Sequence, residues 1–113
     1  MGPISVTDTI DVPREAVFDF VGDLANRPAF TDHFLRDFRL ERFESAGVGA
    51  SARMAVIKAR LWMETLIVEL DRPYRIMERG KGGRLDRIPI LTAWEVVDGP
   101  AAATSEITVR FGT

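Results

Sequence analysis

Residues 4–28 read ISVTDTIDVPREAVFDFVGDLANRP, and they predict a strand followed directly by a helix. Residues 4–10 alternate apolar and polar side chains and are rich in β-branched types, as in a half-buried strand. Pro13 has a fixed φ and needs no amide partner, which suits the first position of a helix. The apolar residues that follow recur at i, i+3, i+4 and i+7, so one helix face is predicted to pack against a sheet. That face consists of Val17, Phe20, Val21 and Leu24.

The rest of the chain is mostly typical of strands. Pro28 disfavours helical geometry at Arg27 and ends the first helix, and a short second helix carrying Phe30 and Phe34 is predicted to follow. Strands are then predicted at residues 38–45, 52–60, 61–71, 74–79, 88–97 and 104–111, separated by turns that contain Gly or Pro. The order strand, helix, helix and six strands predicts an α+β fold with the helices on one side of an antiparallel sheet.

Composition narrows the classes of protein. The 113 residues carry a formal charge of −2 and suit one small domain, residues 1–113. The absence of Cys excludes disulfides, thiolate catalysis and Cys-type zinc sites. The mixed charges argue against non-specific nucleic-acid binding, and no apolar run approaches the ~18 residues of a membrane span. The N-terminus lacks a signal-peptide pattern, so we expect a cytoplasmic protein without a metal or cofactor.

The order and spacing of these segments resemble the START-like superfamily, the helix-grip fold of polyketide cyclase/dehydrase and lipid-transport proteins. The resemblance rests on residues 12–21, 23–28, 47–49, 67–73 and 92–95, and it runs over nearly the whole chain. It implies a curved antiparallel sheet of the Bet v 1-like type, with two short N-terminal helices around a hydrophobic cavity.

One feature departs from this family, which normally has a long C-terminal helix across the concave face of the sheet. The sequence ends at Gly112-Thr113 without that helix. An uncovered apolar face is a liability or an interface. We therefore expect a C-terminal extension, an exchange of elements with a second copy, or a homodimer that pairs this face.

Two carboxylates are the sharpest candidates for chemistry. Period-two alternation along residues 62–70 predicts that Glu64 points inward. If residues 71–73 form a three-residue loop, Leu66 lies opposite Glu78 and both carboxylates share the concave face, whereas a two-residue loop would turn Glu78 outward. The inward set of the first strand would be Trp62, Leu66, Val68 and Leu70.

The sequence leaves the role of Glu64 and Glu78 open. Two carboxylates beside an apolar cavity can act as general acid and base with separated pKa values. Alternatively, at least one is solvated or paired with Arg53, Arg79 or Arg87. His33, the only imidazole, is either a surface residue or a proton-transfer group at the cavity entrance.

The aromatic residues complete the predicted site. Thr92, Trp94 and Val96 share one face of a strand, and each Trp is expected either in the core or in the cavity wall. The candidate catalytic residues are Glu64, Glu78 and His33. The predicted ligand-binding residues are Phe30, Phe34, Met54, Trp62, Glu64, Leu66, Glu78 and Trp94.

Three classes of function follow. The resemblance implies binding of a small hydrophobic or amphipathic molecule, such as a polyketide, lipid or isoprenoid. The first alternative is a polyketide cyclase or dehydratase, in which Glu64, Glu78, His33 or Tyr74 would move protons. The second alternative is a protein-interaction module that uses an exposed face of the sheet.

Overall fold

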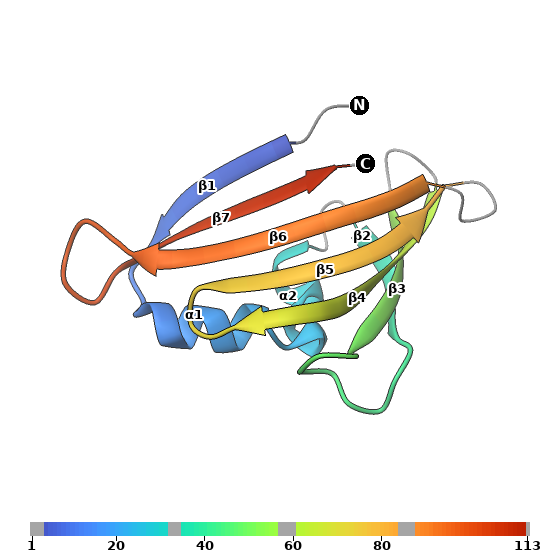
Figure 1. The fold of residues 1–113 in the computed structure, drawn as a ribbon, viewed down its shortest axis with the longest axis horizontal. Helices are drawn as coiled ribbons and strands as arrows, with labels where there is room; N and C mark the ends of the chain where they lie inside the picture. Colours follow the sequence, from blue (N-terminus) through green and yellow to red (C-terminus); the bar gives the residue numbers. More distant parts are fainter. Residues whose placement is uncertain (1–3, 32–34, 57–60, 84–87, 113) are drawn as a thin grey trace.

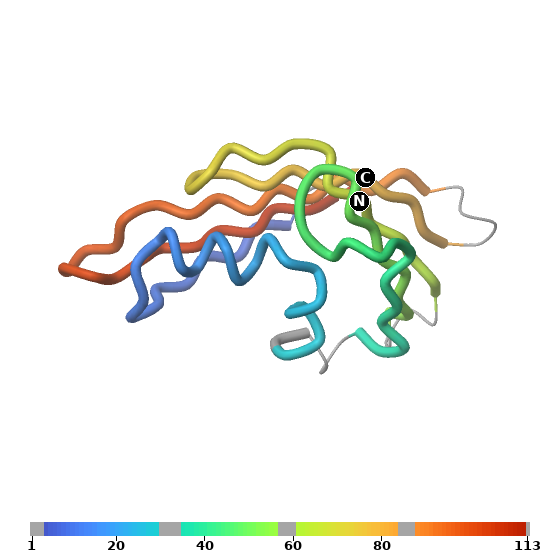
Figure 2. The backbone as a smooth tube through the Cα atoms, turned by 90° about the horizontal axis from the view of Figure 1, so that it is seen from below, coloured from blue at the N-terminus to red at the C-terminus, as the bar shows by residue number. Residues whose placement is uncertain are grey.

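The computed structural model describes residues 4–31, 35–56, 61–83 and 88–112, which form one curved antiparallel sheet with helical segments on one side (Figures 1 and 2). The strand order is β1-β7-β6-β5-β4-β3-β2. The elements in chain order are β1 (Ile4–Ile10), α1 (Arg14–Val21), the 3₁₀ turn η1 (Leu24–Asn26), α2 (Pro28–Thr31), β2 (Leu35–Leu40), β3 (Ser51–Val56), β4 (Leu61–Asp71), β5 (Arg75–Gly82), β6 (Ile88–Asp98) and β7 (Ser105–Gly112).

The topology follows from a run of hairpins. Strands β2 to β6 each pair with the next strand along the chain, and β7 also pairs with β1, so β1 and β2 form the two edges. Six strands after the helical segment agree with the sequence prediction. The loop between β4 and β5 has the expected three residues, but it covers residues 72–74 because Asp71 pairs with Arg75.

A β-bulge in β4 reverses the predicted alternation. Ile67 pairs with Glu78, whereas Glu69 pairs with Met77, so Val68 is an extra residue without a partner. Ile67 is fully buried on the helix-facing side, which we call the concave face, and Leu70 returns to that face beyond the bulge. The predicted inward orientation is therefore correct for Leu70 and wrong for the bulge residue Val68 and for Trp62 and Leu66 before it. Trp62, Leu66 and Val68 are exposed on the opposite, outer face.

Helix α1 packs against the concave face at β6 and β7. It begins at Arg14, one residue after Pro13, and ends at Val21. Phe18 is 4% exposed and Phe20 is 46% exposed, so the prediction that Phe20 belongs to the buried face is wrong. The reason is that the helix ends before Leu24, which lies in η1 and no longer fixes the helix face. The core cluster is Val17, Phe18, Val21, Leu24, Ala50, Ala52, Met54, Ile67, Ile76 and Val96.

The predicted pair of N-terminal helices is not confirmed as such. Helix α1 has 8 residues, whereas α2 is a single turn of 4 residues. Phe30 belongs to α2, and Phe34 lies outside the described residues. Among the described helices, none is long and apolar enough to cross a membrane.

Candidate functional site

The most deeply buried charges of the described chain are an arginine and a glutamate on the concave face. Glu78 lies in the middle of β5, and Arg27 follows η1 directly. Their side chains are 2% and 7% exposed. Nη2 of Arg27 donates to Oε2 of Glu78 over 2.5 Å, and Nη1 donates to Oε1 over 3.3 Å. This bidentate geometry is the strongest form of an arginine–carboxylate contact.

The side chains of this pair form further hydrogen bonds. Thr65 Oγ1 on β4 donates to Oε1 of Glu78 over 2.7 Å. Nε and Nη2 of Arg27 donate to the carbonyl oxygen of Val21 over 3.2 and 3.0 Å. Val21 is the last residue of α1, where free carbonyls and the helix dipole favour a cation. The pair therefore joins the end of α1 to the centre of the sheet.

Local structure places Arg27 at this point. Asp23 accepts the backbone N–H of Ala25 over 3.0 Å and caps η1, so the chain turns back towards the sheet. The guanidinium carbon of Arg27 then lies 4.7 Å from the ring centre of Trp94, a cation–π distance. The sequence pattern leaves the direction of Glu78 dependent on the length of the following loop, and the register places it on the concave face. The same pattern does not reveal Arg27 as its partner. An inward acid on a central strand requires a cation, and that requirement was the available signal.

The second predicted carboxylate lies elsewhere. Glu64 pairs in register with Arg53 and Lys81 on the outer face, so the prediction that it shares the concave face with Glu78 is wrong. Its oxygens lie 3.7 Å from Nη1 of Arg53 and 3.6 Å from Nζ of Lys81. The physical cause is the bulge at Val68, which sets the alternation of β4. The two carboxylates cannot act on one substrate as an acid and base pair.

The other predicted site residues are scattered. Met54 is buried in the core, and Trp94 is half-buried against it. Trp62 lies on the outer face, and its ring centre is 5.7 Å from the guanidinium carbon of Arg53. Tyr74 lies in the β4–β5 loop against Arg14. His33 and Phe34 lie outside the described residues, and the side chain of Phe30 is not described.

Part of the concave face is apolar and open. Register places Phe111 between Ile4 and Thr92, and Thr92 beside Glu78, so these residues share the concave face. Figure 2 shows α1 beneath one half of the sheet, with the strands continuing beyond it. The exposed apolar side chains on the described concave face are Ile4, Val6, Leu40, Leu61, Ile88 and Phe111. Whether a second copy or a further segment covers them stays a prediction.

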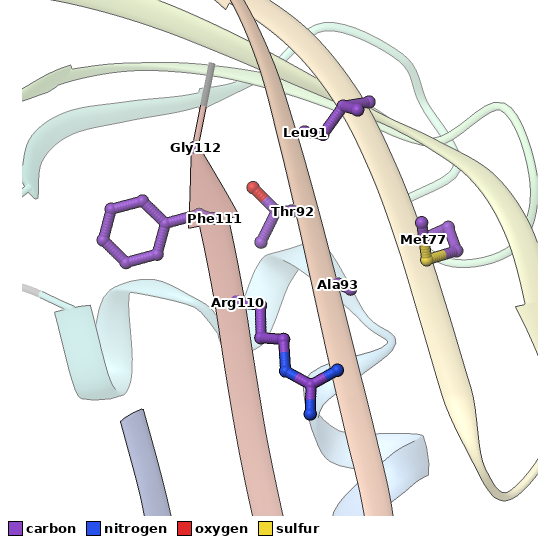
Figure 3. A pocket seen from close by; sticks show the side chains of 7 residues that line it. All are labelled: Met77, Leu91, Thr92, Ala93, Arg110, Phe111 and Gly112. Atoms are coloured by element: carbon purple, nitrogen blue, oxygen red, sulfur yellow. The ribbon is translucent and has the colours of Figure 1, made fainter. Parts of the chain in front are cut away.

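The outer face carries a shallow hollow instead of the predicted internal cavity. The lining residues of this hollow are Met77, Leu91, Thr92, Ala93, Arg110, Phe111 and Gly112 (Figure 3). By register Met77, Leu91, Ala93 and Arg110 belong to the outer face. Phe111 points away from Met77, Leu91 and Arg110. The internal cavity is thus not confirmed. Within the described residues, no group of three or more His, Asp or Glu side chains is placed to hold a metal ion.

A separate exposed ion pair joins α1 to the β4–β5 loop. Nε and Nη2 of Arg72 donate to the two carboxylate oxygens of Asp19, each over 2.8 Å. These hydrogen bonds hold the pKa of Asp19 below its ordinary value and raise the pKa of Arg72. The pair is exposed, so its effect on stability is small.

Comparison with known proteins rests on structure. No family model matches the sequence, and no curated protein matches it. Among solved structures, ginseng major latex-like protein 151 from Panax ginseng aligns with 97% of this chain and 76% of its own, at a TM-score of 0.73 and 14% identity. A START superfamily protein from Mycobacterium smegmatis aligns with 96% of this chain and 74% of its own, at a TM-score of 0.73 and 11% identity.

This chain has the START-like fold. DR_A0006 from Deinococcus radiodurans shares it, with a TM-score of 0.69 and 21% identity over 98% of this chain and 82% of its own. At these identities the likeness concerns the fold alone.

Proposed function

We propose that the concave face binds a small hydrophobic or amphipathic molecule. The observation that carries this proposal is the open apolar half of the face, where Val6 is 55% exposed and Phe111 is also exposed, next to the buried Arg27–Glu78 pair. Binding sites for small molecules are mostly apolar surfaces with a few fixed polar groups. The START-like fold supports the same choice, because latex-like and START proteins share it. A cytoplasmic location is part of this proposal.

The cyclase or dehydratase alternative is less well supported. Both oxygens of Glu78 already accept hydrogen bonds from Arg27 or Thr65, and its side chain is only 2% exposed, so a substrate has little access to it for proton transfer. Glu64 lies on the other face of the sheet. The interaction-module alternative has the exposed outer residues Trp62 and Leu66 in its favour. However, cross-strand ion pairs interrupt that surface, as on a solvated sheet face.

A pair of matched valine variants tests the proposal. Val6 lies on the concave face and Val97 on the outer face, and both are exposed. The neutral dye Nile red should bind several-fold more weakly to the Val6→Asp variant, because a buried charge next to the dye is unfavourable. The Val97→Asp variant should bind it like the original protein. Equal effects of the two substitutions would remove the concave face as the site.

A further inference from the structure

We propose that the concave face selects neutral amphiphiles over anionic ones, and that the hydroxyl of Thr92 binds the polar end of the ligand. This inference rests on the proposed function and names the class of molecule bound. It is supported by the charges of the face, by the free hydrogen-bonding capacity of Thr92 and by the apolar path beside Thr92.

The charges of the concave face disfavour an anion. Arg27, the described cation beside the open half, is already held by Glu78 and by the carbonyl of Val21. Arg14, on the same side of the sheet, pairs with Asp98 at the end of β6. Asp8 lies opposite Ile107, so it belongs to the concave face as well. Within the described residues no cation pairs with Asp8, whose Oδ1 accepts the backbone N–H of Thr9. The described face therefore carries an excess negative charge, and a carboxylate would lie there without a counter-charge.

Thr92 offers a hydroxyl on the concave face that is available to hydrogen-bond a ligand. It lies on β6 between Glu78 and Phe111, and it is half-buried. Its side chain leaves β6 on the side opposite to Leu91 and Ala93 (Figure 3). Among the described residues, none forms a hydrogen bond with the Thr92 hydroxyl, while both carboxylate oxygens of Glu78 beside it already accept hydrogen bonds. A hydroxyl both donates and accepts, so it suits an alcohol or a carbonyl group of a ligand.

The apolar path beside Thr92 defines the rest of the ligand. From Thr92 the concave face continues across β7 at Phe111 to β1 at Ile4, with Val6 next along β1. Two strand spacings amount to about 10 Å, which suits the hydrocarbon part of a medium-chain molecule. We therefore expect a neutral molecule with a hydroxyl or carbonyl end and an extended apolar body.

Competition against Nile red tests this selectivity. Decanol, decanoate and decylammonium have the same hydrocarbon length and differ in the charge of the end group. Decanol should displace the dye at a concentration at least about tenfold lower than decanoate, because the carboxylate would lose its hydration without gaining a cation. Decylammonium should compete better than decanoate, since Asp8 attracts it. Stronger competition by decanoate than by decanol would overturn the inference.

Variants of Thr92 test the anchoring role. Thr92→Val removes the hydroxyl at nearly constant shape. It should weaken the binding of decanol about fivefold, which corresponds to the loss of one neutral hydrogen bond. Thr92→Ser should retain the affinity. Thr108→Val on the outer face of β7 is the matched control and should leave the affinity for decanol unchanged. A Thr92→Val variant that folds and keeps the affinity for decanol overturns the inference while the proposed function stands. Failure of Nile red and all three amphiphiles to bind overturns both.

Discussion

The guanidinium of Arg27 and the carboxylate of Glu78, 51 residues apart in the sequence, form two hydrogen bonds beneath the sheet. This contact joins the segment between η1 and α2 to the central strand β5. It also lies beside the open apolar half of the concave face. The pair therefore contributes to the stability of the helical segment and forms part of the wall of the proposed site.

Removing one partner of this pair should destabilise the protein strongly. Arg27→Met leaves the Glu78 carboxylate buried without a cation, and we expect a loss of about 3–5 kcal/mol in the free energy of unfolding. The double variant Arg27→Met/Glu78→Leu should recover most of that loss, because it buries no charge. Urea denaturation measures both values. The partly exposed pair of Arg53 with Glu64 on the outer face supplies the control, since Arg53→Met should cost less than about 1 kcal/mol. Equal stabilities of the Arg27 and Arg53 variants would contradict the burial of the pair.

The two phenylalanines of α1 should differ in their contribution to stability. Phe18→Ala removes a ring that is 4% exposed in the core, and we expect a loss of about 3–5 kcal/mol. Phe20→Ala should cost clearly less, because that ring is 46% exposed. Thermal or urea unfolding of the two variants checks the order. A larger loss for Phe20 would restore the helix face that the sequence spacing alone predicts.

The sequence predicts the positions of the strands better than the side of the sheet on which each side chain lies. Strand β6 has no bulge, so period-two alternation placed Thr92, Trp94 and Val96 together on the concave face, as the register shows. Strand β4 is also rich in apolar residues, but its alternation shifts at Val68. Neither Gly nor Pro occurs at that position to indicate the bulge. The pairing of β4 with β5 produces the bulge, so a long-range interaction decides the direction of Glu64.

The candidate site was accessible to sequence reasoning only in part. The alternation of β6 predicts the inward direction of Trp94, whereas Glu78 has two possible directions that depend on the loop length; the structure places both residues on the concave face. Arg27 was treated as part of a helix break because Pro28 follows it. Its contact with Glu78 depends on how η1 turns the chain, and local propensities do not contain that information.

The exposed pair of Asp19 with Arg72 predicts a small dependence of stability on pH. The pKa of Asp19 is lower in the folded protein than its ordinary value of 3.8. Its contribution to stability is therefore complete above that ordinary pKa and is lost as the pH falls through the lower, folded value. The difference in unfolding free energy between the original protein and Asp19→Asn should be constant from neutral pH to about pH 5 and should shrink at more acidic pH. A difference that grows on acidification would contradict the sign.

The two tryptophans should report separately on the two faces of the sheet. In the Trp62→Phe variant the fluorescence comes from Trp94, which is half-buried against Arg27 on the concave face. In the Trp94→Phe variant it comes from Trp62, which is 41% exposed on the outer face. Because acrylamide quenches exposed indoles more efficiently, its quenching constant should be clearly larger for Trp62 than for Trp94. Decanol should shift the emission of Trp94 and leave that of Trp62 unchanged, since only Trp94 adjoins the proposed site. Equal quenching of the two indoles would contradict the direction assigned to Trp62 and with it the bulge at Val68, whereas a decanol response confined to Trp62 would place the ligand on the outer face.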